Sequence, residues 1–233
     1  MNRRSYNYVK TPVTLIIGSC LKFALCMVVL GVAGTAQSQL VNGNFETGDF
    51  TGWVLFNTPN GSLGDAQVVQ FDTAGTGTPS FSAQFEVGLT GGYAPQQGGG
   101  ILQYVTLGSG QLTINLGIAA LNVGVVNADG GTFELLLDGT VVDSYAFGEI
   151  GIAGPFGSLP QTNYSTLSYS GTVEAGTHEI AIEMDRDWLN RAGDTPYQYL
   201  DNVVLEGSAI PEPSAIVLAT IGLAAVAVRT RRR

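Results

Sequence analysis

The central part of the sequence lacks several residues on which common active sites depend. The only two cysteines, Cys20 and Cys26, lie within the first 36 residues, and His178 is the single histidine. Without a thiol, the central part can form no disulfide, no cysteine nucleophile and no thiolate metal site. One histidine also excludes a multi-histidine zinc centre.

Positive charge is almost absent from the same region. Of the 10 Lys and Arg residues, four lie in residues 1–36 and four follow Pro213, which leaves only Arg186 and Arg191. The same region contains 18 of the 19 acidic residues. Residues 37–210 therefore carry a formal charge of about −16 (two basic and 18 acidic residues). Nucleic acid and anionic lipid are therefore excluded as partners, because phosphate binding depends on basic residues. An acidic surface instead favours solubility and can attract divalent cations.

The N-terminal residues have the composition of a secretory signal peptide. The first 36 residues contain four basic residues and no acidic one, and residues 23–34 form a mostly apolar run. Small residues follow this run, and cleavage after Ala36 or after Ser38 fits equally well. The run is shorter than the ~20 residues of a stable membrane span. We therefore predict a cleaved signal peptide over residues 1–38, with an uncleaved anchor as the alternative.

The C-terminal residues form a second pattern with three parts. Pro211-Glu212-Pro213 precedes an apolar stretch over residues 214–228, and the chain ends in a basic cluster that comprises Arg229, Arg231, Arg232 and Arg233. As a helix the stretch spans ~22 Å, less than the ~30 Å hydrocarbon core, so it predicts a weak membrane anchor. The arginines are expected to remain cytoplasmic by the positive-inside rule. The prolines keep the junction extended and accessible to a protease.

This order of parts resembles the PEP-CTERM sorting signal. Proteins with this signal pass through the general secretory machinery and are processed by exosortase, a transpeptidase-like membrane enzyme of Gram-negative bacteria that make extracellular polysaccharide. The resemblance implies an inner-membrane intermediate held by a C-terminal transmembrane helix, followed by release or attachment at the cell surface or in the matrix. The alternative is an ordinary tail anchor that happens to contain Pro-Glu-Pro.

Residues 39–208 show the pattern of an all-β domain. Short alternating or apolar runs recur between Gly, Asn, Asp and Pro, and no long helical periodicity is present. The runs predict strands at 66–72, 82–87, 101–107, 111–122, 132–137, 140–147, 166–173, 178–184 and 199–206. Asp138-Gly139 predicts a tight hairpin turn, and the glycine-rich residues 90–100 predict a loop. Many short strands with frequent turns indicate a β-sandwich.

The two edges of this domain resemble the terminal strands of jelly-roll domains of the carbohydrate-binding-module type. Residues 41–48 (VNGNFETG), followed by Gly52-Trp53, resemble the opening strand, and residues 199–205 (YLDNVVL) resemble the closing strand. The resemblance implies a jelly-roll β-sandwich, with Trp53 packed in the core, more strongly than it implies a function.

The same resemblance implies a structural calcium ion, Ca2+, between the first and last strands. Glu46 and Asp201 occupy the matching positions of the two motifs. A hard cation of this kind takes six to eight oxygen ligands from carboxylates and carbonyls. The alternative is that both carboxylates only accept hydrogen bonds in turns.

Residues 185–199 combine aromatic, basic and acidic side chains. They include Trp188, Tyr197 and Arg191 together with several aspartates. Aromatic rings beside carboxylates suit sugar recognition, because the rings stack on apolar sugar faces while polar groups bind hydroxyls. The alternative is a loop in which the arginines pair with aspartates and the aromatic rings cap the sandwich.

Signals for catalysis are weak. Glu183, Asp185 and Asp187 have the spacing of one strand face, so paired carboxylates for glycoside hydrolysis are present. Acidic residues are frequent throughout the domain, however, and His178 stands at a strand start without a Gly-x-Ser-x-Gly motif nearby. We expect no catalytic residue.

Together these features predict an exported, non-catalytic jelly-roll protein of the cell surface or exopolysaccharide matrix. The predicted parts are the signal peptide (1–38), the sandwich (39–208) and the sorting signal (209–233). A polysaccharide ligand is one hypothesis for the sandwich. The rival hypotheses are a purely structural matrix protein without a defined ligand and a polysaccharide hydrolase.

Overall fold

A computed structural model describes residues 35–36, 40–88, 96–123, 128–151, 160–187, 196–207, 210–211 and 222. The chain divides into two compact units, of which one comprises residues 37–210 and the other residues 1–36 with 211–233. Ser38, Glu212, Pro213 and the C-terminal arginines lie outside the described residues. Within the described ranges, no helix has the length and apolar character needed to cross a membrane.

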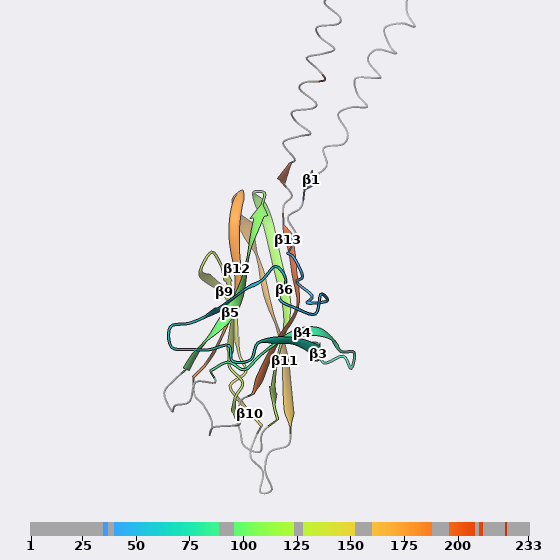
Figure 1. The fold of residues 1–233 in the computed structure, drawn as a ribbon. Helices are drawn as coiled ribbons and strands as arrows, with labels where there is room; N and C mark the ends of the chain where they lie inside the picture. Colours follow the sequence, from blue (N-terminus) through green and yellow to red (C-terminus); the bar gives the residue numbers. More distant parts are fainter. Residues whose placement is uncertain are drawn as a thin grey trace, which may run out of the picture. The chain divides into compact units, whose positions relative to one another are not determined.

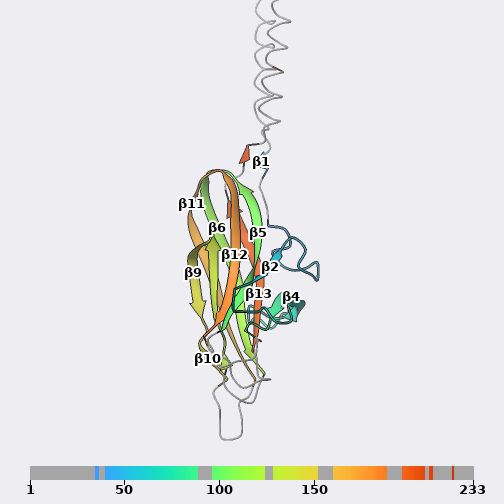
Figure 2. The same ribbon diagram turned by 60° about the vertical axis from the view of Figure 1, so that its left-hand side comes forward.

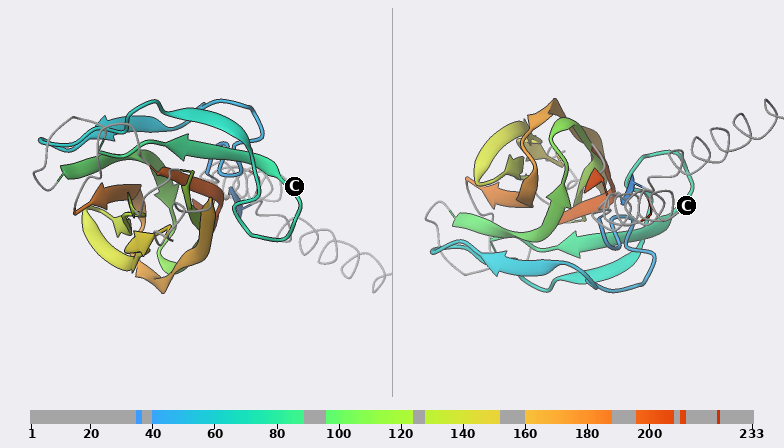
Figure 3. Two further views of the ribbon diagram at one scale, coloured as in Figure 1. Left: turned by 90° about the horizontal axis from the view of Figure 1, so that it is seen from below. Right: turned by 90° about the horizontal axis from the view of Figure 1, so that it is seen from above.

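Residues 37–210 form a jelly-roll β-sandwich of two five-stranded antiparallel sheets (Figures 1 and 2). The first sheet has the strand order β11-β6-β13-β4-β3, and the second has the order β2-β5-β12-β8-β9. Successive strands repeatedly change sheet, so segments distant in sequence become neighbours. Figure 3 shows the sandwich from its two ends. The all-β jelly-roll expected from the sequence is confirmed.

The strands of the first sheet are β3 (Gln67–Phe71), β4 (Ser80–Phe85), β6 (Gly110–Asn122), β11 (Gln161–Val173) and β13 (Tyr197–Gly207). Those of the second sheet are β2 (Val54–Asn57), β5 (Gln96–Leu107), β8 (Thr132–Leu137), β9 (Thr140–Ala146) and β12 (Gly176–Arg186). The short strands β7 (Ala128–Asp129) and β10 (Glu149–Ile150) pair with each other. β1 (Thr35–Ala36) precedes residues 37–210 in the sequence, and β14 (Ile210–Pro211) begins at their last residue.

Alternation of buried and exposed side chains explains why these segments form strands. In β8, Phe133, Leu135 and Leu137 are buried while the residues between them are half-buried. In β12, Ile180, Ile182 and Met184 are all fully buried. A strand that presents every second side chain to the interior buries one apolar face and leaves the other to solvent. Each predicted strand is present, although several begin or end a few residues away from the predicted bounds.

The predicted hairpin turn joins β8 to β9. Asp138 and Gly139 have φ angles of 51° and 73°, the left-handed values that both central residues of a type I′ turn require. Leu137 and Thr140 are the last pair of the ladder before this turn. The Asp-Gly prediction is confirmed.

Two sequence predictions about the second sheet and its entry were wrong. The opening motif, residues 41–48, consists of turns rather than a strand, with positive φ angles at Asn42 and Phe45. The glycine-rich residues 96–100, predicted as loop, belong to β5. A Cβ at Gly100 would collide with the carbonyl oxygen of Ile182 on β12, so the strand passes through a space that only glycine fits.

The opening turns contribute large aromatic residues to the core. The Trp53 ring stacks on Phe45 with centroids 6.0 Å apart, and Phe50 meets Phe45 edge-on at 6.3 Å. Trp53 is 6% exposed, and its Nε1 donates a hydrogen bond to the carbonyl oxygen of Asn42 at 3.1 Å. Trp53 therefore lies in the core, as the sequence predicts.

Candidate functional site

The opening turns and β13 meet at the start of β4, where Glu46 and Asp201 lie close together. Asp201 Oδ2 accepts a hydrogen bond from the Ser80 hydroxyl, and Glu46 Oε1 accepts one from the backbone N–H of Phe81 at 3.2 Å. The Asn202 backbone N–H also donates to Asp201 Oδ1 at 2.6 Å. The structure thus brings together Glu46 and Asp201, the two carboxylates that the sequence singled out as calcium ligands. Each also accepts hydrogen bonds, as the alternative of a purely hydrogen-bonding role requires.

Asp201 is a buried carboxylate, only 1% exposed. Burial raises its pKa above the ordinary value, as does the charge of Glu46, while hydrogen bonds from Ser80, Asn202 and Ser82 oppose the rise. Neither carboxylate is paired with a cationic side chain within the described part of the chain. Two neighbouring carboxylates without a counter-charge form an electrostatically suitable place for a hard cation.

The carboxylates alone are too few for a complete metal site. Among the described residues, no group of three or more acidic or histidine side chains converges on a point where a metal ion would bind. A calcium ion between Glu46 and Asp201 would therefore take most of its ligands from backbone and hydroxyl oxygens, which calcium accepts readily.

The predicted glycan-binding residues are only partly described. Trp188 and Arg191 lie in residues 188–195, outside the described residues. Tyr197 begins β13 and is half-buried, with its ring centroid 6.4 Å from that of Tyr199. Tyr199 itself is buried beneath Phe71, with ring centroids 3.6 Å apart and planes 4° from parallel. Tyr199 therefore belongs to the fold, and Tyr197 remains a binding prediction.

Arg186 is an internal residue rather than a surface charge. It is 1% exposed, and Nη1 donates a hydrogen bond to the carbonyl oxygen of Val87 at 2.9 Å. Burial lowers the pKa of Arg186 to about 10, and the nearby charge of Asp129 works in the opposite direction. This arginine supports the end of the sandwich and is not available to a ligand.

The outward surface of the second sheet, which we call the outer face, has a row of functional groups that the sequence alone did not predict. Cross-strand pairing places Phe56, Gly100, Glu183, Glu134 and Ser144 side by side on β2, β5, β12, β8 and β9, in that order. Glu183 and Glu134 alternate with buried core positions of β12 and β8, so they face outward, and the cross-strand pairing places the other three residues on the same side of the sheet. We call this set the carboxylate row.

An apolar row runs parallel to the carboxylate row, two residues along each central strand. It comprises Val54, Leu102, Ala181, Leu136 and Val141, again one from each of the five strands. Val54 is 55% exposed and Val141 is 46% exposed, so the row ends in open apolar surface. The outer face thus presents apolar area beside acidic groups.

The acidic groups of the outer face are partly desolvated. Burial raises the pKa of Asp185 to about 6, and the charges of four neighbouring carboxylates add to the rise. Burial and the charge of Glu134 also raise the pKa of Glu183. In the described part of the chain, Asp185 Oδ1 is buried without a hydrogen-bond partner. These carboxylates therefore hold a proton more readily than ordinary surface acids.

Asp187 does not continue the strand-face series that the sequence predicts. β12 ends at Arg186, and the backbone N–H of Asp187 donates to Asp129 Oδ2 at 2.7 Å. Glu183 and Asp185 share the outer face as predicted, whereas Asp187 follows the end of the strand. The prediction failed because spacing alone does not show where a strand ends.

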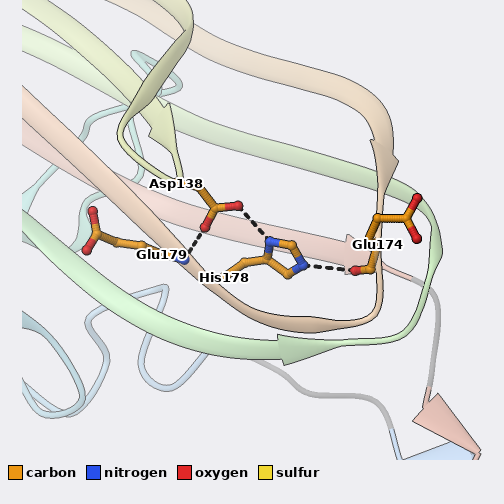
Figure 4. A network of polar contacts seen from close by, with 4 residues as sticks. All are labelled: Asp138, Glu174, His178 and Glu179. Carbon is orange, nitrogen blue, oxygen red and sulfur yellow. Dashed lines mark hydrogen bonds and ion pairs between the residues drawn. The ribbon is translucent and has the colours of Figure 1, made fainter.

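His178 is not arranged as a catalytic base. Its Nδ1 lies 2.8 Å from Asp138 Oδ2, and its Nε2 lies 2.9 Å from the carbonyl oxygen of Glu174 (Figure 4). A general base needs one free nitrogen to take a proton from a nucleophile. Both nitrogens are engaged here, so the histidine has a structural role.

The family comparison identifies the end of the chain. Residues 209–233 match the model of the PEP-CTERM protein-sorting motif, which includes Pro211-Glu212-Pro213 and the terminal arginines. The chain is therefore a jelly-roll β-sandwich protein that carries a PEP-CTERM protein-sorting motif at its C-terminus. A comparison with curated proteins found no match.

Similar solved structures include binding modules and enzymes. A family 61 carbohydrate-binding module in complex with beta-1,4-galactotriose is 14% identical, with a TM-score of 0.43, over 74% of this chain and 100% of that chain. A cyclase from Fischerella sp. TAU is 17% identical, with a TM-score of 0.43, over 76% and 98%. The CBM22-1-GH10 modules of xylanase 10B from Clostridium thermocellum are 13% identical, with a TM-score of 0.41, over 73% of this chain but only 29% of that chain. These identities and scores are too low to transfer a ligand or an activity.

Proposed function

We propose that the protein is an exported exosortase substrate of a Gram-negative bacterium whose jelly-roll domain binds glycan at the cell surface or in the exopolysaccharide matrix. The observation that carries the sorting part is the match of residues 209–233 to the PEP-CTERM protein-sorting motif. The general secretory machinery exports the chain, the C-terminal segment holds it at the inner membrane, and exosortase then processes it near Pro211-Glu212-Pro213.

The sorting proposal has a direct chemical test. Mass spectrometry of the extracellular protein is expected to show a C-terminus upstream of Arg233 and an N-terminus after Ala36 or Ser38. Glu212→Gln is expected to leave the unprocessed chain in the membrane, whereas Ser214→Ala serves as a matched control. An extracellular form that retains Arg233 refutes the processing step.

The outer face is the better-described candidate for glycan binding. Phe56 covers Gly100 so closely that a Cβ added there would lie 2.7 Å from Phe56 Cζ, which fixes the ring beside the carboxylate row. From this half-buried ring on the edge strand β2, the row crosses the sheet through Glu183 and Glu134 to Ser144 on the opposite edge strand β9, so one face combines a stacking surface with hydrogen-bonding groups. Binding sites for small polar ligands use the same combination of apolar area and few polar groups.

The binding proposal is tested on an array of extracellular polysaccharides. Phe56→Ala and Glu183→Gln are expected to weaken binding, while Thr113→Ala on the first sheet leaves it unchanged. If binding is lost instead in Trp188→Ala or Tyr197→Ala, the ligand binds near Trp188 and Tyr197. Absence of binding to every glycan favours the rival hypothesis of a purely structural matrix protein.

We also propose a calcium ion held by Glu46 and Asp201. The buried Asp201 carboxylate and the neighbouring Glu46 lack a counter-charge within the described residues, and an ion there would tie the opening turns to the closing strand. Its role would be structural, because the ion would offset the repulsion between the two carboxylates.

A hydrolase is the second candidate function, and it has one specific observation in its favour. Glu183 and Glu134 are directly paired across β12 and β8, and the pKa of Glu183 is raised. Glycoside hydrolysis uses a general acid of raised pKa together with a second carboxyl group, and the two flank the scissile bond. Release of reducing ends from a polysaccharide panel, lost in Glu183→Gln, would establish catalysis over simple binding.

A further inference from the structure

His178 is held between two turns of the sandwich. It follows the turn that joins β11 to β12, where the carbonyl oxygen of Glu174 lies 2.9 Å from Nε2. On its other side, Oδ2 of Asp138, in the turn between β8 and β9, lies 2.8 Å from Nδ1 (Figure 4). The imidazole ring therefore links the β8–β9 hairpin turn to the connection that crosses from β11 in the first sheet to β12 in the second, and its two partners, Asp138 and Glu174, are 36 residues apart in the sequence (174 − 138).

The two partners of the ring are both acceptors. A backbone carbonyl oxygen has no proton to donate, and an ionised carboxylate has none either. Both ring nitrogens must then carry a hydrogen to make both bonds, which only the imidazolium form provides. A neutral ring has one bare nitrogen lone pair, which would face an oxygen lone pair and lose one of the two hydrogen bonds.

Asp138 is itself positioned for this contact. Its backbone N–H donates to the carbonyl oxygen of Glu179 at 2.9 Å, and the Glu179 backbone N–H donates to Asp138 Oδ1 at 2.9 Å. The second carboxylate oxygen, Oδ2, is thereby directed to His178. The side chain of His178 is 12% exposed and that of Asp138 is 51% exposed, so solvent protons reach the pair from the carboxylate side.

Few other charged groups act on His178. The Glu179 side chain accepts a hydrogen bond from Tyr104 Oη at 2.7 Å, and both residues lie on the outer face. His178 lies on the opposite, inward side of β12, which it shares with Ile180. The neighbouring strands β5 and β11 contain no Asp, Glu, Lys or Arg, and their titratable groups are the tyrosines Tyr104, Tyr164 and Tyr169. On β8 the only charged residue, Glu134, faces outward; on β9, Asp143 accepts a hydrogen bond from the Ser168 backbone N–H at 2.7 Å.

We propose that His178 is a proton-operated latch, which fastens the β8–β9 turn to the β11–β12 turn when the ring is doubly protonated and loosens this end of the sandwich when the ring is neutral. The same hydrogen bonds raise the pKa of His178, first the bond to Asp138 and then the bond to the Glu174 carbonyl oxygen, while burial opposes the rise. Burial would raise the pKa of Asp138, but its hydrogen bonds with His178 and the Glu179 backbone N–H lower it overall. The latch therefore responds to the pH outside the cell once the domain is exported.

The direction of the pH dependence follows from these shifts. A histidine pKa that is raised on folding adds stability that is complete below the unfolded value of about 6.5 and is lost as pH rises through the folded value. An aspartate pKa that is lowered on folding adds stability above about 3.9 that is lost on further acidification. The latch is thus closed in mildly acidic solution and opens toward alkaline pH.

The test uses the fact that His178 is the only histidine. In the full chain in detergent micelles, expressed without a histidine tag, its ring signals in proton NMR can be assigned without mutation and titrated between pH 5 and pH 9. We expect the titration midpoint of His178 in the folded protein to lie above that of the same histidine in the urea-unfolded chain. At low pH the chemical shifts of both ring nitrogens should be those of protonated N–H groups. A midpoint equal to or below the unfolded one overturns the proposal.

Urea unfolding provides the second measurement. For the wild type, the unfolding equilibrium constant is expected to increase about two- to tenfold between pH 6 and pH 9, the range expected for loss of one hydrogen bond. In Asp138→Asn and His178→Gln this increase should shrink to the part that the titration of Asp185 contributes near pH 6, while Glu174→Gln, which keeps the backbone carbonyl, should retain the full increase. Equal pH dependence in all four proteins contradicts the latch.

Discussion

Glu183 on β12 lies directly opposite Glu134 on β8, so two carboxylates of like charge are neighbours on the outer face. Like charges at directly opposed positions of a sheet destabilise it, and burial strengthens their repulsion. The fold maintains this arrangement in a domain that has almost no basic residues with which to neutralise it. Because this pair lowers the stability of the sheet, we interpret it as part of a binding surface rather than as a stabilising element.

Removing one charge of this pair is expected to stabilise the protein. Glu134→Gln should increase the free energy of unfolding by about 0.2–1 kcal/mol at neutral pH, because it removes a like-charge contact. Urea unfolding followed by the fluorescence of the buried Trp53 measures the change. Glu206→Gln on the exposed surface of β13 is the matched control and should have a smaller effect. A loss of stability in Glu134→Gln would contradict the proposed repulsion.

Acidification should stabilise the wild type through Asp185. Burial and neighbouring carboxylates raise its pKa from 3.8 to about 6, so the folded state binds a proton that the unfolded state releases. Stability from this group is therefore gained as pH falls from about 6 toward 4. Melting temperatures measured across this range should rise in the wild type and rise less in Asp185→Asn. This window lies below the one in which His178 titrates, so the two effects can be separated.

Calcium is expected to raise the melting temperature. At a free concentration about 100 times the Kd, one ion bound only by the folded state adds about 2.7 kcal/mol to stability. A chelator should reverse the shift, and Glu46→Gln or Asp201→Asn should abolish it. Asp72→Asn is the control, because Asp72 accepts hydrogen bonds from its own loop and lies apart from the proposed ligands in sequence. An identical melting temperature with calcium and with chelator would falsify the ion proposal.

Gly100→Ala tests the close packing beneath the outer face. The added methyl group meets the Ile182 carbonyl oxygen and the Phe56 ring, so we expect a loss of about 1–3 kcal/mol, as for other over-packed sites. Gly176→Ala is the matched control, since a Cβ there would contact nothing within 4 Å. Because the substitution displaces Phe56, glycan binding should weaken with it. Unchanged stability would show that the strand relaxes around the methyl group.

Local patterns in the sequence were sufficient for much of the fold. The strand β8 was predicted at its observed bounds, because Phe133, Leu135 and Leu137 alternate with polar or less buried residues. The turn at Asp138-Gly139 followed from the φ preferences of those two residues. Both features depend on neighbours within a few positions of the chain. The sorting motif was also readable, since its three parts are consecutive.

Other features depended on contacts between distant segments. The glycines of residues 98–100 were predicted as loop because glycine weakens an isolated strand, yet they lie in β5, where neighbouring backbones approach too closely for a side chain. The four-residue strand β2 was missed because its run is too short to show a clear period. In both cases the partner strand decides the conformation.

By itself, the sequence determined most of the long strands, which of their residues alternate toward the core, and that residues 209–233 form a sorting motif. Only the tertiary structure decided that Glu183 meets Glu134, that Phe56 covers Gly100, and that His178 joins two turns. The physical reason is that alternation is a property of one strand, whereas cross-strand register is selected by the packing of both sheets around their shared interior.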